Sequence, residues 1–467
     1  METFPITVAS AFVINKMPRV DSHEQNAAPA SVLCIYMTYV SKTFLARIFC
    51  FFKSQASFVA ILLAVLGGLR TGSATRIDAE GPLTRDSAIA YGLQHNRDLA
   101  AARFLIEEAR SKARGAGRLT NPEFEGEVAG GRTFEGRIMA GISQKFPLTG
   151  RLRLERQLSG FHVQLAEWEV AEQERQMAIA IGRSFYELAA TREVISILNK
   201  QADFAESFRT LVAEGTRSGM RSQLDEQEAS LAISKIQLDI EAEQASEIEL
   251  VARLCQWLGL PADSTLSLQE NLNLPRSAPA VRSIRNRPDL ELAGLAIRAG
   301  ESSIALSKAK RWEDIGIGVF VEGERFRDDP NGIQPETLAG LKMSIPLPVW
   351  QNGSQQIAES EASRARADSK RESLRFTVQN EVILAHRLMS QRFRSASDFS
   401  RKFLTIARDH VRDCESAHAR GELDPQAAMR ARERLTEIEI SDLEARKAYF
   451  LAYNEWLGAL GETTTNP

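Results

Sequence analysis

The sequence has few of the residues on which metal centres, redox sites and acid–base catalysis depend. Its 467 residues include six His and four Cys, and no two cysteines form a CxxC pair, which argues against zinc ribbons and thioredoxin-type chemistry. P-loop, HExxH, GxSxG and Rossmann motifs are all missing. The 58 basic and 61 acidic residues nearly cancel, so the net charge of −3 gives no overall attraction for nucleic acid. We therefore predict that the chain is not an enzyme and carries no cofactor.

Long apolar runs are also scarce. The main one, residues 56–69, is shorter than the roughly 20 residues of a typical membrane-spanning helix. Basic residues precede it and small residues follow it, which is the order of a secretory signal. We predict that residues 1–74 are an export segment, with Met37 as an alternative start; an N-terminal anchor helix is the competing interpretation. The residues before Cys34 and Cys50 do not fit a lipoprotein signal, so no lipid anchor is predicted.

The rest of the chain contains two copies of one pattern. Four anchors recur in the same order at offsets between 190 and 202 residues: Asn96-Arg97-Asp98-Leu99 with Asn286-Arg287-Pro288-Asp289-Leu290, Phe146-Pro147-Leu148 with Ile345-Pro346-Leu347, Gly219 and Ala229 with Gly421 and Ala431, and Trp257-Leu258-Gly259 with Trp456-Leu457-Gly458. Such internal repetition indicates a duplicated unit. We predict a first repeat over 75–260, a linker over 261–281, a second repeat over 282–461 and a tail over 462–467.

Each copy predicts the same order of elements. A helix (84–118 or 284–311) precedes two β segments, a very long helix (151–214 or 352–418), a Gly-containing turn and a last helix (222–258 or 424–459). A helix of about 64 residues would span nearly 100 Å, which no compact domain accommodates. The second long helix also carries residues at the spacing of a coiled-coil contact line: Ala385, Met389, Arg392, Ala396, Phe399, Phe403 and Ile406.

The four β segments, 123–130, 137–146, 315–324 and 338–347, alternate apolar and polar residues. Two soluble hairpins, each with one buried face, are one interpretation, although an isolated hairpin is marginal in water. The other is a membrane barrel with the apolar side towards lipid and the polar side towards a lumen. Four strands cannot close such a barrel, so several chains would contribute. The lumen-facing candidates are Glu125, Glu127, Lys145, Glu322, Glu324 and Lys342.

Duplicated helix, hairpin and long helical hairpin units behind an export segment resemble the TolC-type outer-membrane efflux proteins, over residues 83–461. The stretches 143–151 and 344–350 are similar to the strand-to-helix junctions of the outer-membrane subunit of heavy-metal pumps, the cobalt–zinc–cadmium and copper–silver exporters. The resemblance implies a mainly α fold with a small membrane β part. It also implies a homotrimer with a twelve-stranded barrel and a helical periplasmic tunnel, met by a periplasmic adaptor and an inner-membrane pump.

The turn from Gly219 to Asp225 is similar to the family's periplasmic tip turn, in which a Gly is followed six residues later by Asp. The resemblance implies that Asp225 lies in an acidic ring at the tunnel mouth; the competing interpretation is that it caps the returning helix. The second turn departs from the pattern, because Ala427 lies six residues after Gly421. Asp424-Pro425 reads there as an N-cap followed by Pro, which puts Asp424 in doubt as a ring residue. Arg217 and Arg221, which flank the first turn, are further entrance candidates.

His410, Cys414 and His418 follow one another at four-residue intervals, just before the second turn. Adjacent pairs are suitable ligands for zinc or copper. All three cannot bind one ion on a straight helix, because the first and last are about 12 Å apart. A chance alignment on a solvated or packed face is the competing interpretation.

Together with these patterns, the resemblance implies an outer-membrane exit duct of a tripartite efflux pump in a Gram-negative-type bacterium, exporting divalent or soft metal cations. A drug or type I secretion duct of the same fold is the first alternative. A periplasmic coiled-coil adaptor is the second, but it would need one helical hairpin beside a compact β domain. Cys255 and Cys414, predicted at opposite ends of their helices, are not expected to pair.

Overall fold

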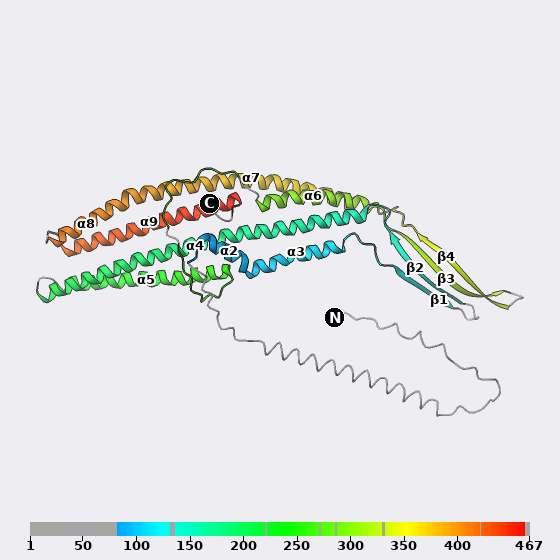
Figure 1. Cartoon of the computed structure of the whole chain (residues 1–467), viewed down its shortest axis with the longest axis horizontal. Coiled ribbons are helices and arrows are strands. Elements are labelled where there is room, and N and C mark those ends of the chain that lie inside the picture. Colours follow the sequence, from blue (N-terminus) through cyan, green and yellow to red (C-terminus); the bar gives the residue numbers. More distant parts are fainter. Residues whose placement is uncertain are drawn as a thin grey trace, which may run out of the picture. The chain divides into compact units, whose positions relative to one another are not determined.

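The computed structural model describes residues 82–130, 136–219, 222–269, 272–284, 287–328, 332–420 and 422–462. The predicted export segment, 1–74, lies outside this part of the chain, as do Arg221 and Gly421. Helices make up most of the described residues, and one small antiparallel sheet completes them (Figure 1). A mainly α fold with a small β part is therefore confirmed.

The same order of elements occurs twice along the chain. The first copy comprises α2 (Arg85–His95), α3 (Arg97–Gly115), β1 (Glu123–Gly130), β2 (Gly136–Phe146), α4 (Arg151–Arg217) and α5 (Gln223–Leu258). The second comprises α6 (Pro288–Ala309), β3 (Ile315–Asp328), β4 (Gly332–Ser344), α7 (Ser354–Phe399), η1 (Ser400–Leu404), α8 (Thr405–Ala419) and α9 (Pro425–Leu460). The long helix α4 packs between α5 and α9, and α9 packs in turn against α7 and α8. These helices therefore lie in the order α5, α4, α9 and the continuous run α7–η1–α8, with α5 and the α7–η1–α8 run as the outer members.

The predicted first helix, 84–118, is wrong in one respect, because it divides at Asn96. The Asn96 backbone is extended (φ −65°, ψ 129°), and its side-chain oxygen accepts a hydrogen bond from the Leu99 amide at 2.9 Å. Its side-chain amide also donates to the Trp257 carbonyl at 3.0 Å. Asn96 thus ends α2, caps α3 and ties this break to the end of α5.

In the structure, the residues of α5 and α9 that correspond to each other differ by about one helical turn from those that the Trp-Leu-Gly match pairs. Helices α5 and α9 each have 36 residues and start 202 residues apart. At that offset Gly259 corresponds to Gly461, and both close their helices in the left-handed conformation, at φ 73° and 83°. Gly458, which the sequence match paired with Gly259, lies inside α9.

The second long helix contains a π turn, η1, which the sequence pattern does not reveal. Val382, Met389, Leu404 and Val411 pack in cores shared with α9, and Ala396 between them is also buried. The step from Ala396 to Leu404 is one residue longer than a heptad, because the π turn accommodates the extra residue. The predicted contact line is therefore wrong beyond Phe399: the Phe403 and Ile406 side chains are 57% and 67% exposed.

The largest apolar core lies where α2, α4, α5 and the linker meet, around Ile181, Phe185 and Leu258. A second core surrounds Trp456 and Tyr449 between α7 and α9. Within the described ranges, no helix is both long and apolar enough to cross a membrane.

Candidate functional site

The four strands form one sheet in the order β1-β2-β3-β4, because β2 pairs with β3 across the two repeats. The register places all six predicted lumen residues on one face: Glu125, Glu127, Lys145, Glu322, Glu324 and Lys342. Glu123, Arg137 and Glu336 lie on the same face. Ion pairs connect several of these groups: Lys145–Glu123 at 2.6 Å, Arg137–Glu127 at 2.5 Å and Arg137–Glu322 at 3.2 Å. We name this surface the charged face.

The charged face is concave. The Lys342 ammonium on β4 lies 2.5 Å from a Glu125 carboxylate oxygen on β1, although β2 and β3 lie between the two strands. Side chains can span two intervening strands in this way only if the sheet curls towards them. Glycines leave the necessary room, since a Cβ on Gly340 would lie 2.6 Å from the Phe320 ring, and one on Gly318 would lie 3.0 Å from Ser143 Cβ. Ser143 itself donates a hydrogen bond to Glu125 at 3.0 Å.

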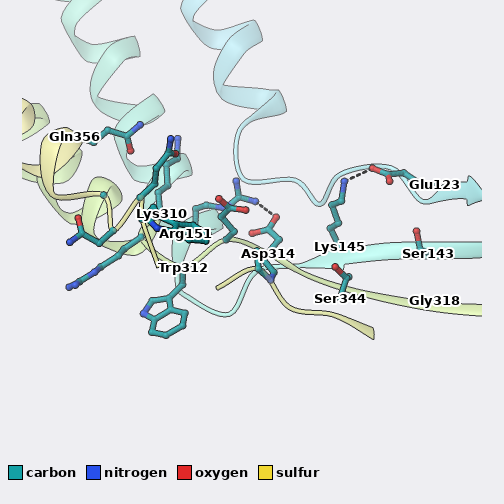
Figure 2. A pocket seen from close by; sticks show the side chains of 18 of the residues that line it. Glu123, Ser143, Lys145, Arg151, Lys310, Trp312, Asp314, Gly318, Ser344 and Gln356 are labelled. Atoms are coloured by element: carbon teal, nitrogen blue, oxygen red, sulfur yellow. Dashed lines mark hydrogen bonds and ion pairs between the residues drawn. The ribbon is translucent and has the colours of Figure 1, made fainter. Parts of the chain in front are cut away.

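A cavity of about 1060 Å³ occupies the base of the charged face, where the strands meet the helices. Figure 2 shows Glu123, Lys145, Arg151 and Asp314 along this wall, with an ion pair between the last two at 2.6 Å. Lys310 and Arg311 also line it, so the wall carries charges of both signs. Arg151 joins the start of α4 to the residue before β3 and thereby fixes the angle between helix and strand. Sequence patterns did not single out this pair, since its partners are 163 residues apart.

The opposite face of the sheet is apolar and exposed. Exposed fractions reach 75% for Phe124, 80% for Val128, 63% for Ile138 and 80% for Leu341. Two soluble hairpins would each bury one face, but in the single chain the apolar face of the sheet is exposed. Burying this face requires an apolar medium or a further partner.

At the helical tips, Asp225 contacts both repeats. It lies at the third position of α5, where its carboxylate accepts a hydrogen bond from the Ser222 amide at 3.1 Å and completes a capping box. Its other oxygen accepts a hydrogen bond from the Gln426 side chain, at the start of α9, at 2.8 Å. Gln426 also donates to Glu228 at 3.2 Å. Asp225 thus caps its helix and links the two tips; sequence patterns gave no signal for Gln426.

The remaining tip candidates are placed as follows. Arg217 is the last residue of α4 and is exposed, and Gly219 follows at φ 76° in the turn. Asp424 is the N-cap of α9 and precedes Pro425 at the first helical position, as predicted. The structure brings Asp225 near the start of α9. A ring of Asp225 carboxylates would need further copies of the chain.

The His410, Cys414 and His418 side chains share α8 but do not converge. The Cys414 sulfur lies 3.7 Å from His410 Nε2 and packs partly into the α8–α9 core. His418 turns instead to the Leu423 carbonyl, at 3.1 Å from Nδ1. Among the described residues, no group of three or more His, Cys, Asp or Glu could hold a metal ion. Cys255 is buried in the largest apolar core, which α2, α4 and α5 share, and neither Cys255 nor Cys414 forms a disulfide.

Long helical hairpins joined to a curled four-stranded sheet define the fold of the TolC-type outer-membrane channels, and the described chain has that fold. CusC is similar with a TM-score of 0.63 and 17% identity, over 81% of this chain and 92% of CusC. The outer-membrane channel OprN gives 0.61 and 16%, over 81% and 89%. The MtrE outer-membrane channel of Neisseria gonorrhoeae gives 0.62 and 14%, over 81% and 89%.

By sequence, the chain is 18% identical to the cobalt-zinc-cadmium resistance protein CzcC of Cupriavidus metallidurans. The alignment spans 390 residues, 83% of this chain and 88% of CzcC. No protein-family model matches the chain. The predicted resemblance to TolC-type proteins is thus confirmed at the level of the fold. The solved relatives are described as channels, which agrees with the prediction that the chain is not an enzyme.

Proposed function

We propose that the protein is an outer-membrane exit duct. Three copies would each give four strands to a twelve-stranded barrel and their long helices to a periplasmic tunnel. The observation that carries this proposal is the single curled sheet, charged on its concave face and apolar on its exposed convex face. A barrel wall has this construction, with lipid outside and water inside.

The edges of the sheet support an assembly of several chains. Within the described residues, β1 and β4 each pair on one side only. In lipid an unpaired strand edge is very costly, since no water satisfies its amides and carbonyls. Pairing β1 of one copy with β4 of the next would remove every edge and close the wall.

We infer that partners act at the helical tips. The Asp225–Gln426 contact lies at the end of the helices far from the sheet along the chain, where a duct would open into the periplasm. We infer that a periplasmic adaptor and an inner-membrane pump meet the duct there, and that the pump supplies the energy. Asp225 is our candidate for the constricting residue of the mouth, together with Arg217 and, from its position in the sequence, Arg221. Asp424 serves as an N-cap.

For the cargo we propose divalent or soft metal cations. The charged face holds six acidic residues, Glu123, Glu125, Glu127, Glu322, Glu324 and Glu336, against three basic ones, Arg137, Lys145 and Lys342. A wall with this excess favours cations, and the similarity to CzcC points the same way. A duct for drugs or other small molecules is the second candidate, because the fold shared with the outer-membrane channels OprN and MtrE does not depend on the cargo. Neither cargo requires metal binding by His410, Cys414 or His418.

Adjacent residues on opposite faces of β1 test the barrel. Glu127→Cys and Val128→Cys are made separately in a chain whose native cysteines are replaced by Ser, and intact outer membranes are treated with a charged maleimide. We expect Glu127→Cys to react and Val128→Cys to react only after detergent and denaturant are added. Equal reaction of both, or release of the protein by a salt wash, would contradict a lipid-facing sheet.

A deletion strain tests the cargo. Growth is compared on zinc, cobalt, cadmium, copper and silver salts, and on dyes, bile salts and antibiotics. Sensitivity to metals alone, restored by the intact gene, is the expected result. Sensitivity to drugs alone would retain the duct and discard the metals.

A further inference from the structure

Two of the three side chains that the sequence singled out on α8 face each other. His410 and Cys414 are about one helical turn apart, and the Cys414 sulfur lies 3.7 Å from Nε2 and 4.0 Å from Nδ1 of the His410 ring. His418 is also four residues from Cys414, but its Nδ1 contacts the Leu423 carbonyl at 3.1 Å. Of the two imidazoles, the structure therefore brings that of His410 to the thiol.

The distance between these two donor atoms suits a shared metal ion. Bonds of about 2.3 Å to a thiolate sulfur and about 2.0 Å to an imidazole nitrogen, meeting at a tetrahedral angle, separate the two atoms by about 3.5 Å. The 3.7 Å from the Cys414 sulfur to Nε2 is close to this value. A small rotation of the His410 ring therefore lets one cation bridge Nε2 and the sulfur while the helix backbone stays as it is.

The two donors differ in how firmly they are held. Cys414 packs partly into the core that α8 and α9 share, beside Val411 and Leu435, so its sulfur has a defined position. The His410 side chain is exposed and can turn towards an ion without losing a core contact. A half-buried thiol beside an exposed imidazole gives a site that an ion can reach from solvent.

The charges around the pair favour a cation. Helix α8 has three acidic residues and two arginines. Arg412 forms an ion pair with Asp409 at 3.1 Å. Arg408 pairs with Glu439 of α9, also at 3.1 Å. The positive charges of both arginines are therefore balanced, and the acidic excess of α8 attracts a cation to this surface.

We propose that His410 and Cys414 form a two-donor site for a thiophilic cation such as Cd²⁺, Cu⁺ or Ag⁺. Thiolate is a soft ligand that prefers such ions, and the thiol releases its proton when the ion binds. A structural zinc centre would need four protein ligands, whereas here water completes the coordination and the ion exchanges. The site goes beyond the exit duct, because neither the tunnel nor its cargo requires it.

Binding has a local consequence for the tip. Cys414 lies five residues before Ala419, the last residue of α8. The two donors come together only when residues 410–414 are helical, so the ion binds the folded turn and not the unfolded one. Such selective binding stabilises the end of α8, and amide hydrogen exchange there should slow when Cd²⁺ is added.

Cadmium titration of the purified full chain in detergent tests the site. In the parent variant the other three cysteines are replaced by Ser, and the ultraviolet charge-transfer absorption of a cadmium–thiolate bond reports occupancy. We expect saturation at one ion per chain, and Cys414→Ser should remove the absorption. His410→Ala should weaken binding about tenfold or more, since even the loss of a group that only orients a ligand costs this much.

Two further variants sharpen the test. His418→Ala is the matched control, because it removes the other imidazole four residues from Cys414, and its affinity for Cd²⁺ should equal that of the parent. His410→Cys replaces one soft donor by another and should restore the binding that His410→Ala loses. Circular dichroism confirms that each variant is folded.

Several results would overturn the site. Equal affinity in the parent and in His410→Ala would do so, as would an equal loss in His418→Ala. Saturation at one ion per three chains would show that the donors come from different copies. A folded parent without cadmium absorption would reduce the short contact to a hydrogen bond between thiol and imidazole. None of these results affects the duct, which the maleimide and growth experiments test separately.

Discussion

The two repeats use different side chains at the equivalent junction between a helix start and the end of the last helix of the repeat. In the first, Asn96 caps α3 and donates to the Trp257 carbonyl near the end of α5. In the second, Arg287 takes the equivalent place before α6 and donates to the Ala459 carbonyl near the end of α9, at 2.8 Å. Each carbonyl lies two residues before the capping glycine of its helix. The duplicated backbone contact has been retained while the group that makes it has changed from a neutral amide to a cation.

That change makes the second junction more dependent on charge. Arg287 is 3% exposed and also pairs with Asp289 at 2.7 Å and with Glu381 at 3.0 Å. Asn96 is equally buried but needs no counter-charge. The same contact therefore has a different sensitivity to mutation and to pH in the two halves.

The largest expected effect is the loss of Arg287. Arg287→Ala leaves Asp289 largely buried without its partner and should lower the free energy of unfolding by about 3–5 kcal/mol. Asn96→Ala, the matched change in the first repeat, should cost about 1–2 kcal/mol. Thermal unfolding of the purified variants in detergent, followed by circular dichroism, measures the difference. Equal losses would show that the charge plays no special part.

A second test uses neighbouring residues at the π turn. Leu404→Ala removes a buried side chain and should destabilise the protein by about 2–5 kcal/mol. Phe403→Ala should leave the unfolding of the subunit nearly unchanged, because the Phe403 side chain is 57% exposed. Thermal unfolding of the two purified variants measures the difference. A larger loss of subunit stability from Phe403→Ala would restore the contact line predicted from the sequence.

A smaller effect is expected at the tips, where the first repeat has a capping box and the second has Asp424-Pro425. Ser222→Ala removes the hydroxyl that accepts a hydrogen bond from the Leu224 amide at 3.2 Å, and should cost about 1 kcal/mol. Ser222→Thr keeps an acceptor and serves as the control. Hydrogen exchange of the first turn of α5 measures the change, and unaltered protection in Ser222→Ala would contradict the role of the cap.

The smallest expected effect is a pH dependence confined to the second junction. Burial acts to raise the pKa of Asp289, but the hydrogen bonds and charge of Arg287 outweigh it and hold the pKa below its ordinary value. A lowered carboxyl pKa stabilises the folded state above the unfolded pKa, and this contribution is lost as the pH falls through the folded pKa. Unfolding midpoints measured from neutral to strongly acidic pH should therefore fall less in Asp289→Asn than in the parent. Parallel curves would show that this carboxyl is not responsible.

The elements of the fold could be predicted because their signals are local and repeated. Alternation predicted four strands, although the fourth begins at Gly332 and ends at Ser344 instead of spanning 338–347. The register confirms that Glu125, Lys145 and Lys342 share a face. The length of α4 followed from an uninterrupted helical pattern. The Asp424-Pro425 cap was also legible, since both residues act within one turn of helix.

The remaining features depend on contacts between distant residues. The break at Asn96 is stabilised by a carbonyl 161 residues away, and the Arg151–Asp314 pair joins the two repeats. The π turn lets Leu404 pack with α9 while Phe403 stays exposed. Apolar spacing alone therefore assigned Phe403 wrongly to the contact line. In the curled sheet, Gly318 and Gly340 lie close to side chains of neighbouring strands, and the sequence of a single strand does not reveal these contacts.

The two unpaired edges of the sheet have a genetic consequence. In a closed ring each copy offers β1 to one neighbour and β4 to the other, so a chain with one damaged edge would spoil the whole assembly. If a cell made intact and damaged chains in equal amounts, about one trimer in eight would contain intact copies only. Edge mutations should therefore act dominantly, and co-expression of such a chain would strongly reduce the activity of the proposed duct without deletion of its gene.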